Sequence, residues 1–478
     1  MSVRRPVAVG LARLTASVVG AAHHQGTALP GMVAERIWPH GFADLAQQLD
    51  STTLVVGTNG KTTTAGLIAE ILGRMDGRPI ANRSGANLRQ GIMSTLVRMS
   101  DLGGHLRPPD HGSRDAVFEV DEAALEQILP ALRPAVIVAT NLFRDQLDRY
   151  GEADSVVDRW TVALTRAAEG SVFIYCADDP RLAMLAAGSS LPTITFGLAG
   201  VPSDRDHPSD IGDAAADPVA CRTCGRQLEY VWRSIGHLGS FFCPNGHVER
   251  VAPDIAIELT QGASAFGVDQ GPAPRTTLAL SGRFGEAIAH PALPGLTNAY
   301  NVAAAAAAGC ATGHEISACA EAMDGYVGPF GRFEWMTVDG RRVLLILVKN
   351  TISLAETVRL GRDMPADVVL IGLNDAPADG RDVSWIWDAP IADFVAGRAV
   401  VLTGSRSDDL CLRLKSDPDV VSTPPTSVQQ TISLAAAFDL AIARAPRDGL
   451  VVAAATYTAM MGLRAIAERR GHTPAAPR

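Results

Sequence analysis

Apolar runs and helical stripes alternate along most of this chain. Short apolar runs occur at 52–57, 115–120, 135–143 and 171–179. Runs of this length and composition are typical of strands buried on both faces of a sheet. After the first run, apolar residues from Leu67 to Leu72 recur at the spacing of one helix face. The alternation predicts an α/β fold with a parallel sheet and helices on both of its faces.

The same alternation restarts in the last third of the chain. Further apolar runs occur at 341–350, 367–375, 398–406 and 449–457. We interpret them as a second α/β domain of Rossmann-like type. Between the two series lie a polar connector, a cysteine cluster, a β-rich stretch (254–290) and an alanine-rich helix (298–309). The predicted domains are a short lead-in (1–50), a central domain (51–325) with an insert at about 217–250, and a C-terminal domain (326–478).

The lead-in has a pattern of its own. Two arginines, an apolar stretch and small residues imitate a secretory signal, but Arg13 interrupts the apolar stretch. We therefore expect a retained helix there, followed by a loop at 23–31 and a second short helix up to Leu49. No apolar run in the sequence approaches the roughly 20 residues needed to cross a membrane.

Composition and charge narrow the range of functions. A chain of 478 residues exceeds the size at which a single core stops growing, about 250–300 residues, so more than one core is expected. The net charge of −9 argues against nucleic acid as a partner. The seven cysteines are odd in number, and three of them lie between 221 and 243. This usage predicts a reduced, cytoplasmic protein with a candidate metal site rather than a disulfide scaffold.

The stretch "TLVVGTNGKTTTAGLIAEIL" (53–72) carries the first candidate chemistry. It joins a strand, a glycine-bearing turn and a helix start, and such a turn directs backbone N–H groups at phosphate oxygens. It departs from the common G-x-x-x-x-G-K-[ST] pattern because Val55 occupies the first glycine position. We predict that Lys61 reaches the terminal phosphates of a nucleotide and that the Thr62 hydroxyl binds Mg²⁺. The alternative is a helix start that contains glycine but binds no ligand.

The cysteine cluster has the spacing of a zinc site. Cys221 and Cys224 form one C-x₂-C pair, and Cys243 follows after eighteen residues. Zinc ribbons use two such pairs, and Gly246 here replaces the fourth cysteine. His247, one residue later, can supply the fourth ligand. We predict a small β-hairpin ribbon with structural Zn²⁺, and the alternative is a degenerate ribbon without metal.

The loop "GTNGKTTT" resembles the ATP-binding loop of the Mur ligase superfamily, which includes the peptidoglycan stem-peptide ligases and folylpolyglutamate synthase. Three further blocks stand in that family's order: "TNLFRDQLDRYG" (140–151), "LPGLTNAYNVAAAAA" (293–307) and "GRFE" (331–334). Together these blocks cover most of 50–335. The resemblance implies a Mur ligase-like central ATP-binding domain. It also implies an ATP- and Mg²⁺-dependent ligase that activates a carboxylate as an acyl phosphate.

The resemblance also implies roles for individual residues. The loop residues that would bind ATP are Gly57, Thr58, Asn59, Gly60, Lys61, Thr62 and Thr63. Asn298 and Asn301 match the asparagines that contact adenine, and Arg332 matches an arginine that reaches ribose or phosphate. Glu119, at the end of a predicted strand, matches the family's magnesium-binding acidic position; it would bind Mg²⁺ together with Thr62 and act in catalysis.

Two departures separate the chain from amino-acid-adding members of the superfamily. Gln146 stands where those enzymes have a metal-binding histidine. No lysine lies between Lys61 and Lys349 to serve as their carbamylated lysine. With its cysteine ribbon and the segments "LVKN" (347–350) and "GLNDAPADGRDVSWIWD" (372–388), the chain resembles the synthetase-subunit branch that amidates lipid II.

This branch implies a reaction and its partners. ATP activates the α-carboxylate of D-glutamate in the lipid II stem peptide, and ammonia converts it to D-isoglutamine during peptidoglycan synthesis. The ammonia comes from a separate GatD-like glutaminase subunit in a heterodimer or larger complex. Cys310 lies at the end of the alanine-rich helix, without the spacing of a nucleophile elbow, so the chain needs that partner unless free ammonia suffices.

The resemblance implies one further contribution to the partner and a location. The synthetase lends an aspartate to the glutaminase Cys–His pair; Asp382 and Asp388 are the candidates, and we favour Asp382 in the turn-rich half of its segment. A lipid-linked substrate implies a cytoplasmic protein that works at the inner face of the membrane.

Two other interpretations stay open at this point. An amino-acid-adding Mur ligase or a folylpolyglutamate synthase-like ligase would use an amino acid as the nucleophile. A non-enzymatic ATP-binding scaffold would keep the fold without turnover. Hydrolysis of ATP only in the presence of an acceptor carboxylate would separate a catalyst from a scaffold.

Overall fold

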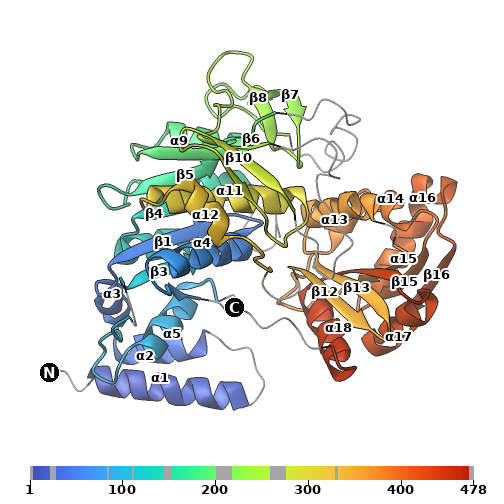
Figure 1. The fold of residues 1–478 in the computed structure, drawn as a ribbon, viewed down its shortest axis with the longest axis horizontal. Helices are drawn as coiled ribbons and strands as arrows, with labels where there is room; N and C mark the ends of the chain where they lie inside the picture. The colour runs from blue at the N-terminus through green and yellow to red at the C-terminus, as the bar shows by residue number, and fades with distance from the viewer. Residues whose placement is uncertain are drawn as a thin grey trace.

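The computed structural model describes most of the chain. The described residues are 4–21, 28–82, 86–109, 112–144, 153–200, 218–258, 276–328, 332–364 and 366–472. They form two large sheets with their own helices, and a small hairpin (Figure 1).

The larger sheet organises the first two thirds of the fold (Figure 1). Its strands are β1 (Ser51–Val56), β2 (Ile80–Ala81), β3 (Asp115–Glu119), β4 (Val136–Ala139), β5 (Val172–Cys176), β6 (Thr193–Leu198), β9 (Ile255–Glu258), β10 (Leu278–Gly282) and β11 (Ala287–Ala289). They lie in the order β11-β10-β9-β6-β5-β4-β1-β3-β2. All neighbours from β2 to β9 are parallel, whereas β10 and β11 are antiparallel. The predicted parallel sheet is confirmed, but strands β2 and β6 were not predicted.

Helices pack closely around this sheet. They are α4 (Lys61–Met75), α5 (Arg89–Met99), α6 (Leu125–Leu132), α8 (Ala153–Leu164), α9 (Pro180–Ala187), α11 (Leu296–Ala311) and α12 (Ile316–Ala322). α11 packs against α4, β5 and β6, and the side chains from Val302 to Ala308 are buried. Alanine lets this helix approach its neighbours on every side, and the predicted helix at 298–309 is confirmed. The N-terminus of α11 is thereby held beside α4.

The N-terminal segment forms a helical layer of α1 (Arg4–Ala21), α2 (Leu29–Ile37) and α3 (Gly41–Ala46). α2 packs against α1 and α5. The predicted loop at 23–31 is too long, because α2 begins at Leu29 and accepts Pro30 in its first turn, where no N–H is needed. The single helix predicted up to Leu49 is wrong, since the chain leaves helical geometry at Trp38. No described helix is both long and apolar enough to cross a membrane.

The insert forms the hairpin predicted from the cysteine spacing. Its strands β7 (Glu229–Arg233) and β8 (Gly239–Phe242) pair antiparallel. The turn between them is anchored in the core: His237 Nε2 lies 3.4 Å from Asp179 Oδ2, and Ser234 Oγ lies 2.9 Å from the Tyr300 hydroxyl of α11. The ribbon is therefore fastened to the same helix that carries the candidate adenine-binding asparagines.

A second sheet forms the C-terminal part (Figure 1). Its strands are β12 (Arg332–Val338), β13 (Arg341–Leu347), β14 (Val368–Gly372), β15 (Ala399–Thr403), β16 (Ser427–Thr431) and β17 (Leu450–Ala455). The order is β12-β13-β17-β14-β15-β16, and only β12 is antiparallel. The helical segments are α13 (Thr351–Asp363), the 3₁₀ turn η1 (Ser384–Trp387), α14 (Ala392–Val395), α15 (Ser407–Ser416), α16 (Pro418–Ser422), α17 (Leu434–Arg444) and α18 (Tyr457–Arg469). The predicted second α/β unit is confirmed, while β12 and the half-buried edge strand β16 were not predicted.

Candidate active site

Two glycines shape the phosphate-binding loop between β1 and α4. Gly57 and Gly60 have φ angles of 131° and 87°, which residues with a Cβ rarely adopt. A Cβ on Gly57 would lie 2.2 Å from Thr140 Oγ1, and one on Gly60 would lie 2.1 Å from Asn301 Oδ1. Both close approaches require glycine. The loop therefore folds directly against the end of β4 on one side and α11 on the other.

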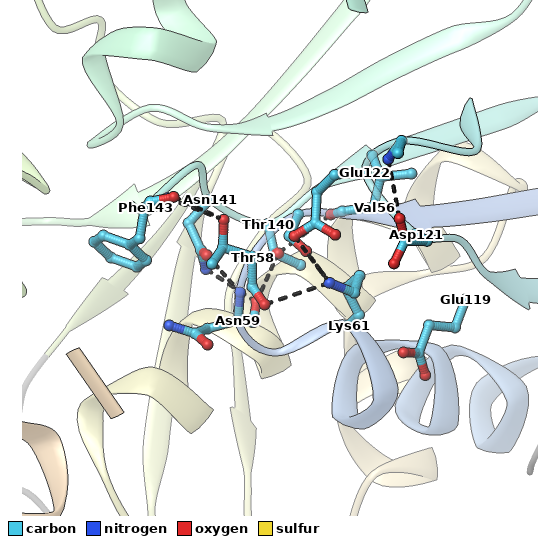
Figure 2. Close-up of polar contacts among 12 residues, drawn as sticks. Val56, Thr58, Asn59, Lys61, Glu119, Asp121, Glu122, Thr140, Asn141 and Phe143 are labelled. Atoms are coloured by element: carbon cyan, nitrogen blue, oxygen red, sulfur yellow. Dashed lines mark hydrogen bonds and ion pairs between the residues drawn. The ribbon is translucent and has the colours of Figure 1, made fainter. Parts of the chain in front are cut away.

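Side chains after β4 hold the loop in shape (Figure 2). Asn141 Oδ1 accepts the backbone N–H of Asn59 at 2.9 Å, and Thr140 Oγ1 donates to the Asn59 carbonyl at 2.8 Å. The Thr58 hydroxyl accepts the Phe143 N–H at 3.1 Å. These bonds hold the loop in a geometry that suits an anion at the helix start.

Lys61 lies inside the loop and is almost completely buried. Its Nζ donates to the Thr58 carbonyl at 3.3 Å and to Glu122 Oε1 at 3.1 Å, and it also contacts the Gly57 carbonyl (Figure 2). A buried ammonium group needs such partners, because burial disfavours an unpaired charge. Glu122 was not predicted as a site residue; it lies in the loop after β3, one residue beyond the short "VFEVD" run, where no local pattern marks it.

Thr62 and Glu119 form the candidate magnesium site. Thr62 Oγ1 donates to Glu119 Oε2 at 2.7 Å. Asn82 clamps the backbone of Glu119 on both sides, since its Oδ1 accepts the Glu119 N–H at 2.9 Å and its Nδ2 donates to the Glu119 carbonyl at 2.8 Å. Hydroxyl and carboxylate oxygens are ligands that Mg²⁺ prefers, so the donor set fits that ion. The structure brings together the two residues that the sequence assigned to it.

The two candidate adenine-binding asparagines lie in the first turns of α11, next to the loop. Asn301 Nδ2 donates to Asn298 Oδ1 at 3.1 Å, and Asn298 Nδ2 donates to the Pro294 carbonyl at 2.6 Å. Thr64 of α4 donates to Asn301 Oδ1 at 3.2 Å. The asparagines are therefore linked to each other and to the helix that begins at the loop.

The C-terminal unit also reaches the loop. Lys349 Nζ, just after β13, donates to the Thr58 carbonyl at 3.1 Å. The neighbouring Asn350 Nδ2 lies 3.4 Å from Asn59 Oδ1. Both contacts join positions 291 residues apart in the sequence, and neither was predicted. The two sheets therefore meet at the phosphate-binding loop.

The two candidate glutaminase-contacting aspartates flank η1. Asp382 Oδ1 accepts the Ser384 N–H at 2.8 Å. Hydrogen bonds from the Ser384 side chain and backbone, aided by the charge of Arg144, lower the pKa of Asp382 below its ordinary value. Asp388 lies exposed at the other end of the same turn. Neither side chain is part of the phosphate-binding loop.

The ribbon residues gather as the spacing predicts. One ligand atom from each of Cys221, Cys224, Cys243 and His247 lies within 4.8 Å of all the others. The Cys224 and Cys243 sulfurs are 3.7 Å apart, and Cys243 Sγ is 3.6 Å from His247 Nδ1. A tetrahedral zinc ion with ordinary bond lengths separates two sulfurs by about 3.8 Å and a sulfur from a nitrogen by about 3.6 Å. The donor set and its spacing fit zinc.

The side chains of Gln146 and Arg332 lie outside the described part of the structure. Arg332 begins β12. Their predicted relation to metal and nucleotide stays a prediction.

Comparison with known proteins identifies the domain families and the fold of this chain. Residues 55–219 match the Mur ligase middle domain, and residues 347–460 match the MurT ligase C-terminal domain. Among solved structures, a pseudomurein peptide ligase type C from Methanothermus fervidus aligns with a TM-score of 0.64 at 17% identity, covering 88% of this chain and 78% of that one. MurF from Acinetobacter baumannii aligns with a TM-score of 0.61 at 15% identity, covering 91% and 81%. The chain has the fold of the Mur ligases.

Curated relatives that are similar over most of the chain identify its family within the Mur ligases. The MurT subunit of lipid II isoglutaminyl synthase (glutamine-hydrolyzing) from Staphylococcus aureus (strain N315) is 30% identical over 86% of this chain and 88% of its own length. The MurT subunit from Streptococcus pneumoniae (strain ATCC BAA-255 / R6) is 28% identical over 93% of both chains. The chain belongs to the MurT family of lipid II isoglutaminyl synthase subunits.

Proposed function

We propose that the chain is the ATP-dependent synthetase that amidates the α-carboxylate of D-glutamate in the lipid II stem peptide. An oxygen of this carboxylate attacks the γ-phosphorus of ATP, the bond from phosphorus to the bridging oxygen breaks, and ADP leaves. The nitrogen of ammonia then attacks the acyl carbon, and the bond from that carbon to the phosphate oxygen breaks. Inorganic phosphate leaves, a proton passes to phosphate or water, and D-isoglutamine remains.

The residues of the loop have matching tasks. The backbone of 57–63 holds the phosphates, and the Lys61 ammonium balances the charge that develops on their oxygens. Thr62 and Glu119 would hold Mg²⁺, which shields the phosphate charge when it is bound. Asn298 and Asn301 frame the adenine, and Arg332 reaches the nucleotide from the C-terminal side. The Thr62–Glu119 contact of 2.7 Å beside the loop is the observation that carries this assignment.

The remaining assignments complete the proposal. Residues 51–325 act as the ATP-binding domain, with the insert at about 217–250, and 326–478 act as the C-terminal domain. A GatD-like glutaminase subunit supplies ammonia in a heterodimer or larger complex, and Asp382 or Asp388 completes its catalytic residues. The protein works in the cytoplasm at the inner face of the membrane, where its lipid-linked substrate is anchored. An exposed apolar stripe on α1, formed by Val7, Leu11, Leu14 and Val18, supports a peripheral position there.

Amidation of lipid II tests the proposed function directly. The purified chain is incubated with Mg-ATP and liposomes that contain a D-glutamate lipid II, and the product is identified by mass spectrometry. We expect amidation with ammonium and none with glutamine until the glutaminase subunit is added. Ligation of an added amino acid, without amidation by ammonium, would instead assign the chain to the amino-acid-adding ligases.

The ribbon is proposed to hold structural Zn²⁺ through its three cysteines and His247. We expect one equivalent of zinc per purified chain, measured by plasma mass spectrometry, and a loss of at least about 100-fold in zinc affinity for Cys243→Ser. Loss of zinc should lower the temperature of unfolding, because the hairpin turn is anchored beside α11. Cys411→Ser is the matched control, since Cys411 is a free cysteine in α15 outside the ribbon. Full occupancy in Cys243→Ser would contradict the assignment.

A further inference from the structure

Helix α1 is apolar on two opposite faces. One face packs against α2 and α5 and carries three completely buried side chains: Ala8, Val9 and Ala12. The other face carries the α1 stripe, four large apolar side chains with exposed fractions from 43% to 61%: Val7, Leu11, Leu14 and Val18. Residues at this spacing line one side of a helix. Packing within the fold therefore accounts for only the first of the two faces.

The orientation of α1 is fixed by two of its arginines. Arg5 Nη2 donates to Asp44 Oδ2 at 3.0 Å, and the Arg5 guanidinium lies 5.1 Å from the centroid of the Trp38 ring. Arg13 donates to the Ser100 carbonyl. Figure 1 shows α1 at the edge of the molecule, with α2 and α5 on its inner side. The stripe is thereby held facing away from the rest of the fold.

The charge around the α1 stripe is positive, although the protein as a whole is acidic. α1 contains three arginines and no acidic residue, whereas the whole chain has a net charge of −9. Residues 4–49 contain four arginines and two acidic residues, and both of these, Glu35 and Asp44, form salt bridges with arginines. Arg4 is exposed and precedes Val7 by three positions, so it lies in line with the stripe.

An anionic lipid surface matches both the apolar side chains and the charge. A helix of this kind lies in the plane of a bilayer, with its apolar side chains among the upper acyl chains. Arginines beside the apolar face extend their guanidinium groups to the lipid phosphates. A second copy of α1 is a poorer partner, since its arginines would bring the same positive charge to the contact.

We propose that α1 docks the protein in the plane of an anionic bilayer, through the α1 stripe and the arginines beside it. This inference rests on the proposed function, because a lipid-linked acceptor is met at that surface. Docking holds the protein and the acceptor on the same surface and so raises their effective concentration. It lowers the KM for a membrane-bound acceptor and leaves kcat nearly unchanged.

Vesicle binding tests the docking surface. The full chain is sedimented with vesicles of phosphatidylglycerol and phosphatidylethanolamine, and in parallel with vesicles of phosphatidylcholine alone. We expect binding to the anionic vesicles that weakens with added salt, and a loss of at least about 10-fold in this binding for Leu11→Gln/Leu14→Gln. Leu412→Gln/Val421→Gln is the matched control, because these two apolar side chains are also exposed, by 56% and 67%, on the C-terminal unit.

Two results of this assay overturn the proposal. One is wild-type binding to anionic vesicles by Leu11→Gln/Leu14→Gln. The other is a wild-type chain that does not bind the vesicles and forms a dimer that Leu11→Gln/Leu14→Gln cannot form, measured by light scattering. The stripe would then join two copies of the chain.

Two forms of the acceptor separate this inference from the proposed function. Ammonium-dependent amidation is measured with D-glutamate lipid II in anionic liposomes and with a soluble analogue that has a short prenyl chain. We expect Leu11→Gln/Leu14→Gln to raise KM for the liposomal acceptor by about 10-fold and to amidate the soluble analogue as the wild type does, which also shows that the variant is folded. Wild-type kinetics of the variant with both acceptors overturns docking and leaves the proposed function standing. A wild-type chain that amidates neither acceptor overturns the proposed function, while its vesicle binding still decides whether α1 docks.

Discussion

Replacing Glu119 by glutamine lowers the rate of amidation by about 100-fold or more while the fold is kept. Glutamine has the shape of glutamate, and its Oε1 can still accept the Thr62 hydroxyl that lies 2.7 Å from the native carboxylate. It lacks the negative charge that Mg²⁺ requires of a ligand at this position. The rate is measured as acceptor-dependent ADP release across a range of Mg²⁺ concentrations. We expect the variant to need a higher Mg²⁺ concentration for its half-maximal rate, in addition to the lower rate itself.

Glu126→Gln is the matched control for Glu119→Gln. Glu126 lies in α6 and pairs with Arg166 on the surface, so its replacement should change neither the rate nor the Mg²⁺ requirement. The temperature of unfolding should be unchanged in both variants, since the clamp on the Glu119 backbone by Asn82 remains. A wild-type rate for Glu119→Gln at low Mg²⁺ would remove Glu119 from the metal site.

The sequence is sufficient to predict the parts of this site that are local. Strand, turn and helix around Lys61 follow from hydrophobic pattern and two glycines. The end of β3 places Glu119 at the carboxyl edge of a parallel sheet, where ligands bind. The ribbon cysteines also follow from spacing, because a tetrahedral site constrains how far apart ligands can lie in the chain.

Contacts between distant segments could not be predicted in this way. No sequence pattern around Glu122 indicates that its carboxylate pairs with Lys61, because the pairing depends on how the loop after β3 packs against the phosphate-binding loop. Lys349 and Thr58 are 291 positions apart, and their contact depends on how two sheets dock. The edge strand β16 was also not predicted. Its sequence "SVQQT" contains one large apolar residue, and its positions alternate between half-buried and exposed.

Replacing Asp382 by asparagine abolishes most glutamine-dependent amidation and leaves ammonium-dependent amidation intact. Asparagine can still accept the Ser384 N–H that now bonds Asp382 Oδ1 at 2.8 Å, so the turn before η1 is kept. The negative charge is lost. Since the Ser384 hydrogen bonds and Arg144 lower the pKa of Asp382, its carboxylate is ionised at neutral pH and suited to orient a histidine of the partner. We expect a loss of about 100-fold or more in glutamine-dependent rate.

The comparison of nitrogen sources makes this prediction specific to the partner. Both rates are measured with the complete complex, once with glutamine and once with ammonium as the nitrogen source. A general defect in the synthetase lowers both rates, whereas a lost glutaminase residue lowers only the first. Asp388→Asn is the matched variant, because Asp388 lies exposed at the other end of η1. If Asp388→Asn loses the glutamine-dependent rate and Asp382→Asn keeps it, the role belongs to Asp388.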